Sequence, residues 1–249
     1  MLTLYIKEYC VLHDETIFAH SLPDKTLALT FDDGPGVTEG KGPGPRTLEL
    51  AEYLAGEKVF VSFFFLGQRV RALPDVVREV HALGHLIGNH TQDHPSLDVL
   101  VAKNQTPVTT ILEGDLAIRE TLGLDAQAPV LFRAPYGNWN ADVAKWARQE
   151  SRLARSVGPI GWDMPVREGD WHFWGHYFPP QEAADAFMRE IEFTGRGVID
   201  LHDHASDPKL GAVNRTFEMM QLLVPLLKDR GYSFVRLDEI AEIKVAMGL

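Results

Sequence analysis

The chain has 249 residues, a length that allows one large α/β domain or two small ones. It is 45% hydrophobic and 24% charged, close to an average globular protein, and no stretch approaches the ~20 consecutive apolar residues of a membrane span. Lys and Arg number 24 against 35 Asp and Glu, which gives a formal net charge of -11. Phosphate backbones and anionic membranes repel such a chain, so we expect neither a nucleic-acid nor a membrane partner.

The first twenty residues carry no pattern of a secretory signal. Such a signal needs roughly 7–15 uninterrupted apolar residues after a basic start, and here Lys7 and Glu8 end the first apolar run. We therefore expect a cytoplasmic protein. Cys10 is the single cysteine, so no disulfide can form within the chain.

Short apolar segments recur along the chain and are continuous rather than alternating, which is typical of strands buried on both faces. In chain order they are residues 27–31, 59–66, 85–89, 130–133, 159–162, 197–201 and 233–237. Longer amphipathic segments typical of helices alternate with them, at residues 46–56, 74–83, 110–122, 140–150, 180–194, 214–230 and 238–247.

This alternation predicts an α/β fold with a parallel sheet. At this length a distorted β/α barrel of about seven parallel strands fits better than a doubly wound sheet, although periodicity alone does not separate the two. We expect a single domain over residues 1–249, with an N-terminal extension over 1–26 and a core at about 27–240. No GxGxxG follows the first predicted strand, which counts against a dinucleotide site.

Ionisable residues follow five of the predicted strands, at the end where each strand stops. In a β/α barrel the catalytic groups collect at the C-terminal ends of the strands. Five such ends on one side are not expected of ordinary solvated loops, and they predict an active site. The residues concerned are Asp32 and Asp33, His90 and His94, Arg133, Asp163 and His202.

Two histidines and one carboxylate are candidate ligands of a metal site. His90 and His94 are four residues apart, so on a helical turn their imidazoles would share one face. With Asp33 they would hold a divalent metal and leave a position open, as catalytic rather than structural sites do. Alone, the two histidines would more often cap a helix or pair with Asp93. The ionisable residues at the other strand ends, which include Asp32 and His202, favour the metal site instead.

The remaining polar residues supply candidates for proton transfer. Either Asp32 or Asp33 could be the metal ligand, with the other as the base that takes a proton from water. His202 is the natural general acid because its pKa lies near neutrality. Asp163 or Asp170 could orient His202. Arg133 could orient the base, and the backbone N–H of Tyr136 could stabilise an oxyanion.

Aromatic residues gather near these motifs. Flat rings suit the apolar faces of sugar rings, because stacking on them loses little side-chain entropy. For any one of them, ordinary packing is an equally good interpretation. They are Tyr136, Trp139, Trp162, Trp171 and Trp174.

Five short motifs together resemble those of one family. They are TFDDGP at 30–35, HTQDH at 90–94, RAPYG at 133–137, WDMPVREGDW at 162–171 and LHD at 201–203, and SFFFLGQ at 62–68 adds to the likeness. In order and spacing they resemble the polysaccharide deacetylases of carbohydrate esterase family four, which act on chitin, peptidoglycan and acetylxylan. The resemblance covers essentially the whole chain from residue 27 to 240.

The resemblance implies a distorted β/α barrel that hydrolyses N- or O-acetyl groups with the help of a metal. It implies Asp32 as the general base, a metal-bound water as the nucleophile and His202 as the general acid. It further implies that Arg133 positions Asp32 and that Asp170 tunes His202. The implied metal ligands are Asp33, His90 and His94, and the implied substrate-binding residues are Pro135, Trp162, Trp171 and Leu201, with Trp171 and Leu201 around the acetyl methyl group.

The implied cofactor is one divalent metal ion, zinc in most relatives, with cobalt or nickel also competent. An acetylated oligosaccharide or a small acetamido compound is the expected substrate, and the oligomeric state stays open. The loop at 36–45 looks longer than in the family, and the spacing from Trp162 to Asp170 looks stretched. That spacing leaves the choice between Asp163 and Asp170 open.

Three other functions fit parts of the pattern. A hydrolase of the same fold would act on a non-sugar amide or a cyclic ureide. An iron oxygenase would use Asp33, His90 and His94 as a facial triad, but it has no need of the base Asp32. A non-catalytic sugar-binding protein would be expected to have lost the base or a ligand.

Overall fold

The computed structural model describes residues 12–40, 42–163 and 169–249. Cys10 and residues 164–168 of the predicted WDMPVREGDW motif lie outside the described part. The strands in the described part are β1 (Leu12–Ile17), β2 (Thr26–Asp32), β3 (Ser62–Phe65), β4 (Leu86–Asn89), β5 (Val130–Leu131), β6 (Ser156–Ile160), β7 (Gly197–His202) and β8 (Ser233–Phe234).

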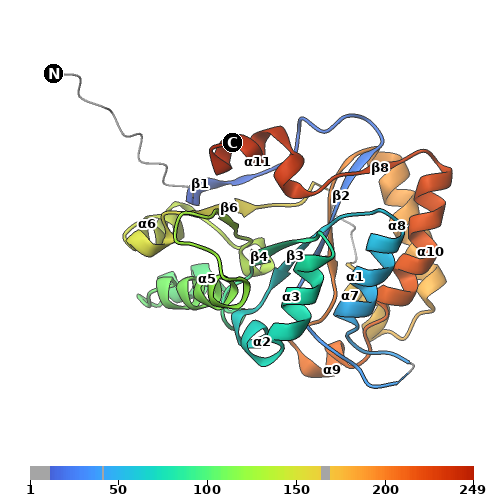
Figure 1. Ribbon diagram of the computed structural model, residues 1–249, viewed down its shortest axis with the longest axis horizontal. Helices are drawn as coiled ribbons and strands as arrows, with labels where there is room; N and C mark the ends of the chain where they lie inside the picture. Colours follow the sequence, from blue (N-terminus) through green and yellow to red (C-terminus); the bar gives the residue numbers. More distant parts are fainter. Residues whose placement is uncertain (1–11, 41, 164–168) are drawn as a thin grey trace.

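Helices follow most of these strands, as the alternating sequence pattern predicts. Figure 1 shows α1, α3, α8 and α10 on one side of the strands, whereas α6 lies beside β1 and α5 beside β4. The helices are α1 (Thr47–Gly56), α2 (Gly67–Ala72), α3 (Pro74–Ala82), α4 (Leu97–Ala102), α5 (Val108–Leu122), α6 (Ala141–Ala147), α7 (Asp170–Gly175), α8 (Pro180–Thr194), α9 (Pro208–Gly211), α10 (Thr216–Asp229) and α11 (Ala241–Met247), with short 3-10 turns η1 (Pro135–Gly137), η2 (Ser151–Leu153) and η3 (Leu237–Glu239).

Every pairing between the described strands is parallel, and the strands form two sheets. One has the order β4-β3-β2-β7, with β8 beside β2, and the other the order β1-β6-β5. A bridge between Asn89 and Phe132 joins β4 to β5, and the Asp163 N–H donates to the Val198 carbonyl at the other side. The fold is thus the predicted distorted β/α arrangement, in which an isolated bridge and a few hydrogen bonds, rather than ladders, join the two sheets.

The strand β1 is not among the predicted strands and lies within residues 1–26, which we expected to precede the core. Its sequence, LHDETI, has no apolar run, and only Leu12 in it is fully buried. It pairs with β6 at the edge of its sheet, where polar side chains reach water. Hydrophobic patterning therefore gave no signal for it.

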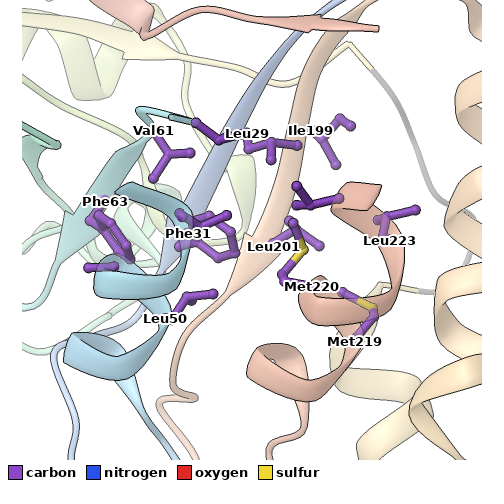
Figure 2. Packing of buried hydrophobic residues seen from close by; sticks show 14 of the residues in the cluster. Leu29, Phe31, Leu50, Val61, Phe63, Ile199, Leu201, Met219, Met220 and Leu223 are labelled. Atoms are coloured by element: carbon purple, nitrogen blue, oxygen red, sulfur yellow. The ribbon is translucent and has the colours of Figure 1, made fainter. Parts of the chain in front are cut away.

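The strand β2 lies at the centre of the larger sheet, and all seven of its residues are buried. Its outer face packs against the helices, where Phe31 stacks on Phe63 with ring centroids 5.2 Å apart. Figure 2 shows Leu201 of β7 in the same layer, next to Met220 of α10. Burial of this apolar layer fixes the strands in place and so positions the residues at their ends.

No helix in the described part of the chain is long and apolar enough to cross a membrane.

A buried histidine links the residue before β3 to α1. The Val61 N–H donates to His85 Nδ1 at 3.2 Å, and His85 Nε2 lies 2.9 Å from the Ala51 carbonyl. The proton is therefore on Nε2, where it can be donated to that carbonyl. Burial lowers the pKa of His85, because the charged imidazolium loses hydration, and protonation of Nδ1 would break the bond to Val61.

We expect His85 to make the fold sensitive to acid. In the unfolded chain its pKa returns to about 6.5, so below that pH the unfolded state binds more protons and stability falls. Urea unfolding at about pH 7.5 and pH 5.5 should show a smaller loss of stability in His85→Gln than in the wild type. The same loss in both proteins would contradict this role.

Candidate active site

The C-terminal ends of the strands surround a cavity of about 500 Å³, which we call the strand-end pocket. In a β/α fold this is the edge of the sheet where loops and side chains build binding sites. The predicted site residues that line it are Asp32, Asp33, His90, His94, Tyr136, Trp162, Trp171 and His202. Most of the site residues predicted from the sequence thus lie around one pocket.

The predicted metal ligands converge within this pocket. Asp33 Oδ1 lies 3.3 Å from His94 Nε2 and 3.8 Å from His90 Nε2, and a ligand atom from each of the three residues lies within 4.8 Å of the others. Asp33 Oδ1 is buried and accepts no hydrogen bond from the described residues. A buried carboxylate oxygen without a partner is costly, and a cation between these groups would satisfy it. The donor set therefore fits a divalent metal.

The histidines are held in the form that binds a metal. His90 Nδ1 lies 2.9 Å from the Arg133 carbonyl, to which it can donate a proton, so the lone pair of Nε2 is left for a metal. Burial lowers the pKa of His90 to about 3, and the pKa of His94 is also lowered by burial. Both rings are then neutral near pH 7, as metal coordination requires.

The backbone around the ligands differs from the predicted helical turn. Residues 90–94 form an irregular loop, in which Thr91 and His94 have φ angles of 71° and 62°. Asp33 and Tyr136 also have positive φ, at 75° and 60°. Left-handed backbone is uncommon for residues other than glycine and clusters at functional sites. These turns, rather than a helix face, point the side chains together.

Asp32 is held by a buried arginine. Arg133 Nη1 donates to Asp32 Oδ1 at 2.9 Å, which leaves Oδ2 facing His90 Nε2 at 3.6 Å. Burial raises the pKa of Asp32 well above its usual range, and the charge of Arg133 opposes that rise only in part. A carboxylate with one fixed and one free oxygen, and with raised basicity, is suited to accept a proton.

The structure pairs His202 with Asp170. Asp170 Oδ1 lies 2.8 Å from the ring atom Nδ1 of His202. Asp170 Oδ2 accepts hydrogen bonds from the backbone N–H of His202 and from the Thr216 hydroxyl, each at 2.8 Å. Burial alone would lower the pKa of His202, but the carboxylates of Asp170 and Asp200 outweigh it and raise that pKa well above its usual range. These carboxylates therefore favour the protonated form of His202.

Asp163, the alternative partner for His202, does something else. Its carboxylate accepts the Ala19 N–H at 3.3 Å and the Val198 N–H at 2.8 Å. The Val198 bond adds to the one that the Asp163 N–H donates to the Val198 carbonyl, so Asp163 links the β6 loop to β7. Asp163 therefore stabilises the fold, and Asp170 is the carboxylate beside His202.

Two predicted substrate-binding residues do not line the pocket. Leu201 is 0% exposed and packs in the core with Leu223 and Met220 (Figure 2). Successive side chains of a strand point to opposite faces, so β7 turns Asp200 and His202 into the pocket instead. Pro135 is buried, and only its neighbours on either side reach the cavity.

Asp200 is one of the pocket-lining residues that the sequence analysis missed, and Ser206 and Asp207 are others. The alternation of β7 around His202 was the signal that could have identified Asp200.

The aromatic residues divide into two groups. Tyr136, Trp162 and Trp171 line the strand-end pocket, and the Tyr136 ring lies edge-on to the His94 ring at 4.5 Å. The Tyr136 N–H donates to none of the described residues, so it is available as an oxyanion donor. Trp139 donates to the His13 carbonyl and Trp174 is buried, so these two serve in packing.

A parallel β/α fold with carboxylates and imidazoles gathered at its strand ends is typical of β/α enzymes, whose active sites lie at that edge. A sequence profile described as polysaccharide deacetylase matches residues 19–151, more than half of the chain. The chain therefore belongs to the polysaccharide deacetylase family, a family of carbohydrate deacetylases.

Individual relatives agree with this assignment. A chitooligosaccharide deacetylase of Rhizobium leguminosarum bv. trifolii is 30% identical, over 84% of this chain and 89% of the relative. A peptidoglycan-N-acetylglucosamine deacetylase of Bacillus cereus is 27% identical, over 89% of this chain and 90% of the relative. In fold, the chain is similar to the crystal structure of a peptidoglycan N-acetylglucosamine deacetylase, with a TM-score of 0.66, 23% identity and 96% of each chain covered. These relatives do not favour the alternative of a non-sugar amide as substrate.

The ligand set can be tested by direct metal binding. We expect the wild type to retain one zinc ion per chain after dialysis, measured by plasma mass spectrometry. Removal of a ligand in His94→Ala should weaken zinc binding by at least ~100-fold, since loss of a mere supporting partner costs about 10–100-fold. His81→Ala, which alters an exposed histidine of α3, is the control and should bind zinc like the wild type. Equal zinc content in His94→Ala would contradict the site.

Proposed function

We propose that this chain is a metal-dependent deacetylase that removes N-acetyl groups from oligomers of N-acetylglucosamine. The observation that carries the proposal is the approach of Asp33, His90 and His94 within 4.8 Å, beside a separate base and acid in one pocket. The names of the two relatives above, a chitooligosaccharide and a peptidoglycan-N-acetylglucosamine deacetylase, support the same substrate class.

Asp33, His90 and His94 would hold the metal, which we propose to be zinc, with cobalt or nickel as competent substitutes. When bound, such an ion supplies Lewis acidity that polarises the acyl carbonyl and lowers the pKa of water. Three protein ligands leave room for water and substrate, as catalytic sites do.

Asp32 is the proposed general base. Its Oδ2 faces the ligand cluster, while Arg133 fixes Oδ1 and so the orientation of the carboxylate. Asp32 takes a proton from the attacking water as the new carbon–oxygen bond forms. The Tyr136 N–H would donate to the carbonyl oxygen while that oxygen carries negative charge.

His202 is the proposed general acid. Asp170 holds its Nδ1, so Nε2 is the atom that carries the proton to the leaving nitrogen. Protonation of that nitrogen lets the carbon–nitrogen bond break, giving acetate and a free amine. The raised pKa of His202 keeps it protonated until that step.

A second cavity supports an oligomer rather than a single sugar as the substrate. It has a volume of about 270 Å³ and shares Ala134, Tyr136 and Trp162 with the strand-end pocket. Thr16 of β1 and Phe18, which follows β1, also line it. An apolar cavity with aromatic walls next to the reaction centre suits the neighbouring sugar ring of a chain.

Acetate release from N-acetylglucosamine oligomers in the presence of zinc tests the proposal. Asp32→Asn and His202→Ala should each lower kcat by about 10²–10⁴-fold, because each removes a proton-transfer group. Zinc content should stay at the wild-type level in both. Asp75→Asn, an exposed carboxylate on α3, is the matched control. Retained activity in both site variants would exclude the assigned roles.

The pH profile tests the pairing of Asp170 with His202. Removal of the carboxylate in Asp170→Asn lowers the pKa of His202, so the acid form is lost at a lower pH. The alkaline limb of kcat/KM should then move to lower pH, and kcat should fall by about 10²-fold or more. An unmoved alkaline limb would show that Asp170 does not tune the acid.

A further inference from the structure

Asp200 places a carboxylate deep in the strand-end pocket. In the register of β2 with β7, His202 lies opposite Asp32 and Asp200 lies opposite Thr30. Asp200 and His202 point to the same face of β7, and both line the pocket. Asp200 is two residues nearer the start of the strand, so it lies below the proposed acid and base, at the floor.

One oxygen of this carboxylate is engaged and the other is free. Asp200 Oδ1 accepts from Arg133 Nη1 at 3.0 Å, and the side chain is 17% exposed. Across the ranges 12–40, 42–163 and 169–249, no residue donates to Asp200 Oδ2. The floor of the pocket therefore offers an open polar atom to whatever reaches it.

The reaction geometry decides which part of the substrate reaches the floor. The reacting carbonyl carbon carries an oxygen, the nitrogen of the sugar and the acyl substituent. The sugar needs the open mouth, and its nitrogen must face His202. The oxygen must face Asp33, His90 and His94. The acyl substituent is left to point inward, toward Asp200.

A plain methyl group is a poor partner for this floor. It displaces water from the carboxylate and returns no hydrogen bond. A hydroxyl on the same carbon would bond to Oδ2, and hydrogen bonds to charged groups are the stronger kind. A hydroxyl also both donates and accepts, so it fits the carboxyl group in either protonation state.

We infer that Asp200 sets the acyl specificity of the site, which takes a hydroxyl-bearing two-carbon acyl group, glycolyl, in preference to acetyl. This inference rests on the proposed function. The chemistry is the same hydrolysis: water adds to the acyl carbon, the carbon–nitrogen bond breaks, and glycolate and an amine are released. Asp200 would thus be a specificity residue that touches the acyl group.

A matched pair of substrates isolates the hydroxyl. N-glycolyl and N-propionyl glucosamine dimers have acyl groups of equal size, with a hydroxyl in one where the other has a methyl. The zinc-loaded wild type should hydrolyse the glycolyl dimer with a kcat/KM about 10–100-fold above that of the propionyl dimer, measured by free-amine release. It should also prefer glycolyl to acetyl.

Variants at Asp200 test the source of that preference. Asp200→Leu should lower the glycolyl-to-propionyl ratio at least ~10-fold, whatever happens to the absolute rate. Asp200→Asn keeps the size and polarity of the side chain and should lower the ratio less. This variant keeps the test valid if Asp200→Leu fails to fold. Asp75→Asn should keep the wild-type ratio.

The outcomes separate the two proposals. Hydrolysis of the acetyl and propionyl dimers at least as fast as the glycolyl dimer, or an unchanged ratio in Asp200→Leu, would overturn the acyl specificity and leave the deacetylase intact. Release of no amine from any dimer by zinc-loaded protein would overturn both.

Discussion

The site depends on the hydrogen bonds that the buried guanidinium of Arg133 donates. Its Nη1 donates to Thr30, Asp32 and Asp200, while Nε and Nη2 donate to the carbonyls of residues 160 and 161. These bonds join β2, β7 and the end of β6, which belong to two different sheets. A buried cation is costly unless its donors are satisfied, and here every nitrogen of the fork has an acceptor. Its main-chain carbonyl also orients His90.

Two adjacent aspartates acquire different tasks from their surroundings. Asp32 ends a strand and keeps regular backbone, so its side chain lies beside Arg133. Asp33 turns into left-handed backbone, and its Oδ2 accepts the Ser206 N–H while Oδ1 faces the histidines. One carboxylate is therefore tied to a cation of the protein, and the other is left with an oxygen for an external one. On sequence grounds the two were interchangeable.

The parts of the fold that could be predicted are those set by burial. β2, β3, β4 and β7 are continuous apolar runs, and the polar residues after them fall at one edge for that reason alone. The left-handed residues of the 90–94 loop, Thr91 and His94, are not glycines, so a helical turn fitted the spacing of the two histidines equally well. Asp200 lies just outside the LHD motif of residues 201–203, so the family likeness does not identify it. The orientation of the Asp200 side chain follows from the alternation of side chains along β7, and a sequence motif does not describe that alternation.

The edge strand β1 has a consequence for how such a protein can change. The segment that follows it supplies Phe18 to the second cavity, yet β1 contributes only Leu12 to the buried core. Residues here can be replaced with little effect on the buried layers that align the strand ends. The buried layers thus align the proposed reaction centre, whereas the segment around Phe18 forms a border of the second cavity. New chain lengths or decorations of a glycan could be accommodated through that border without disturbing the reaction centre.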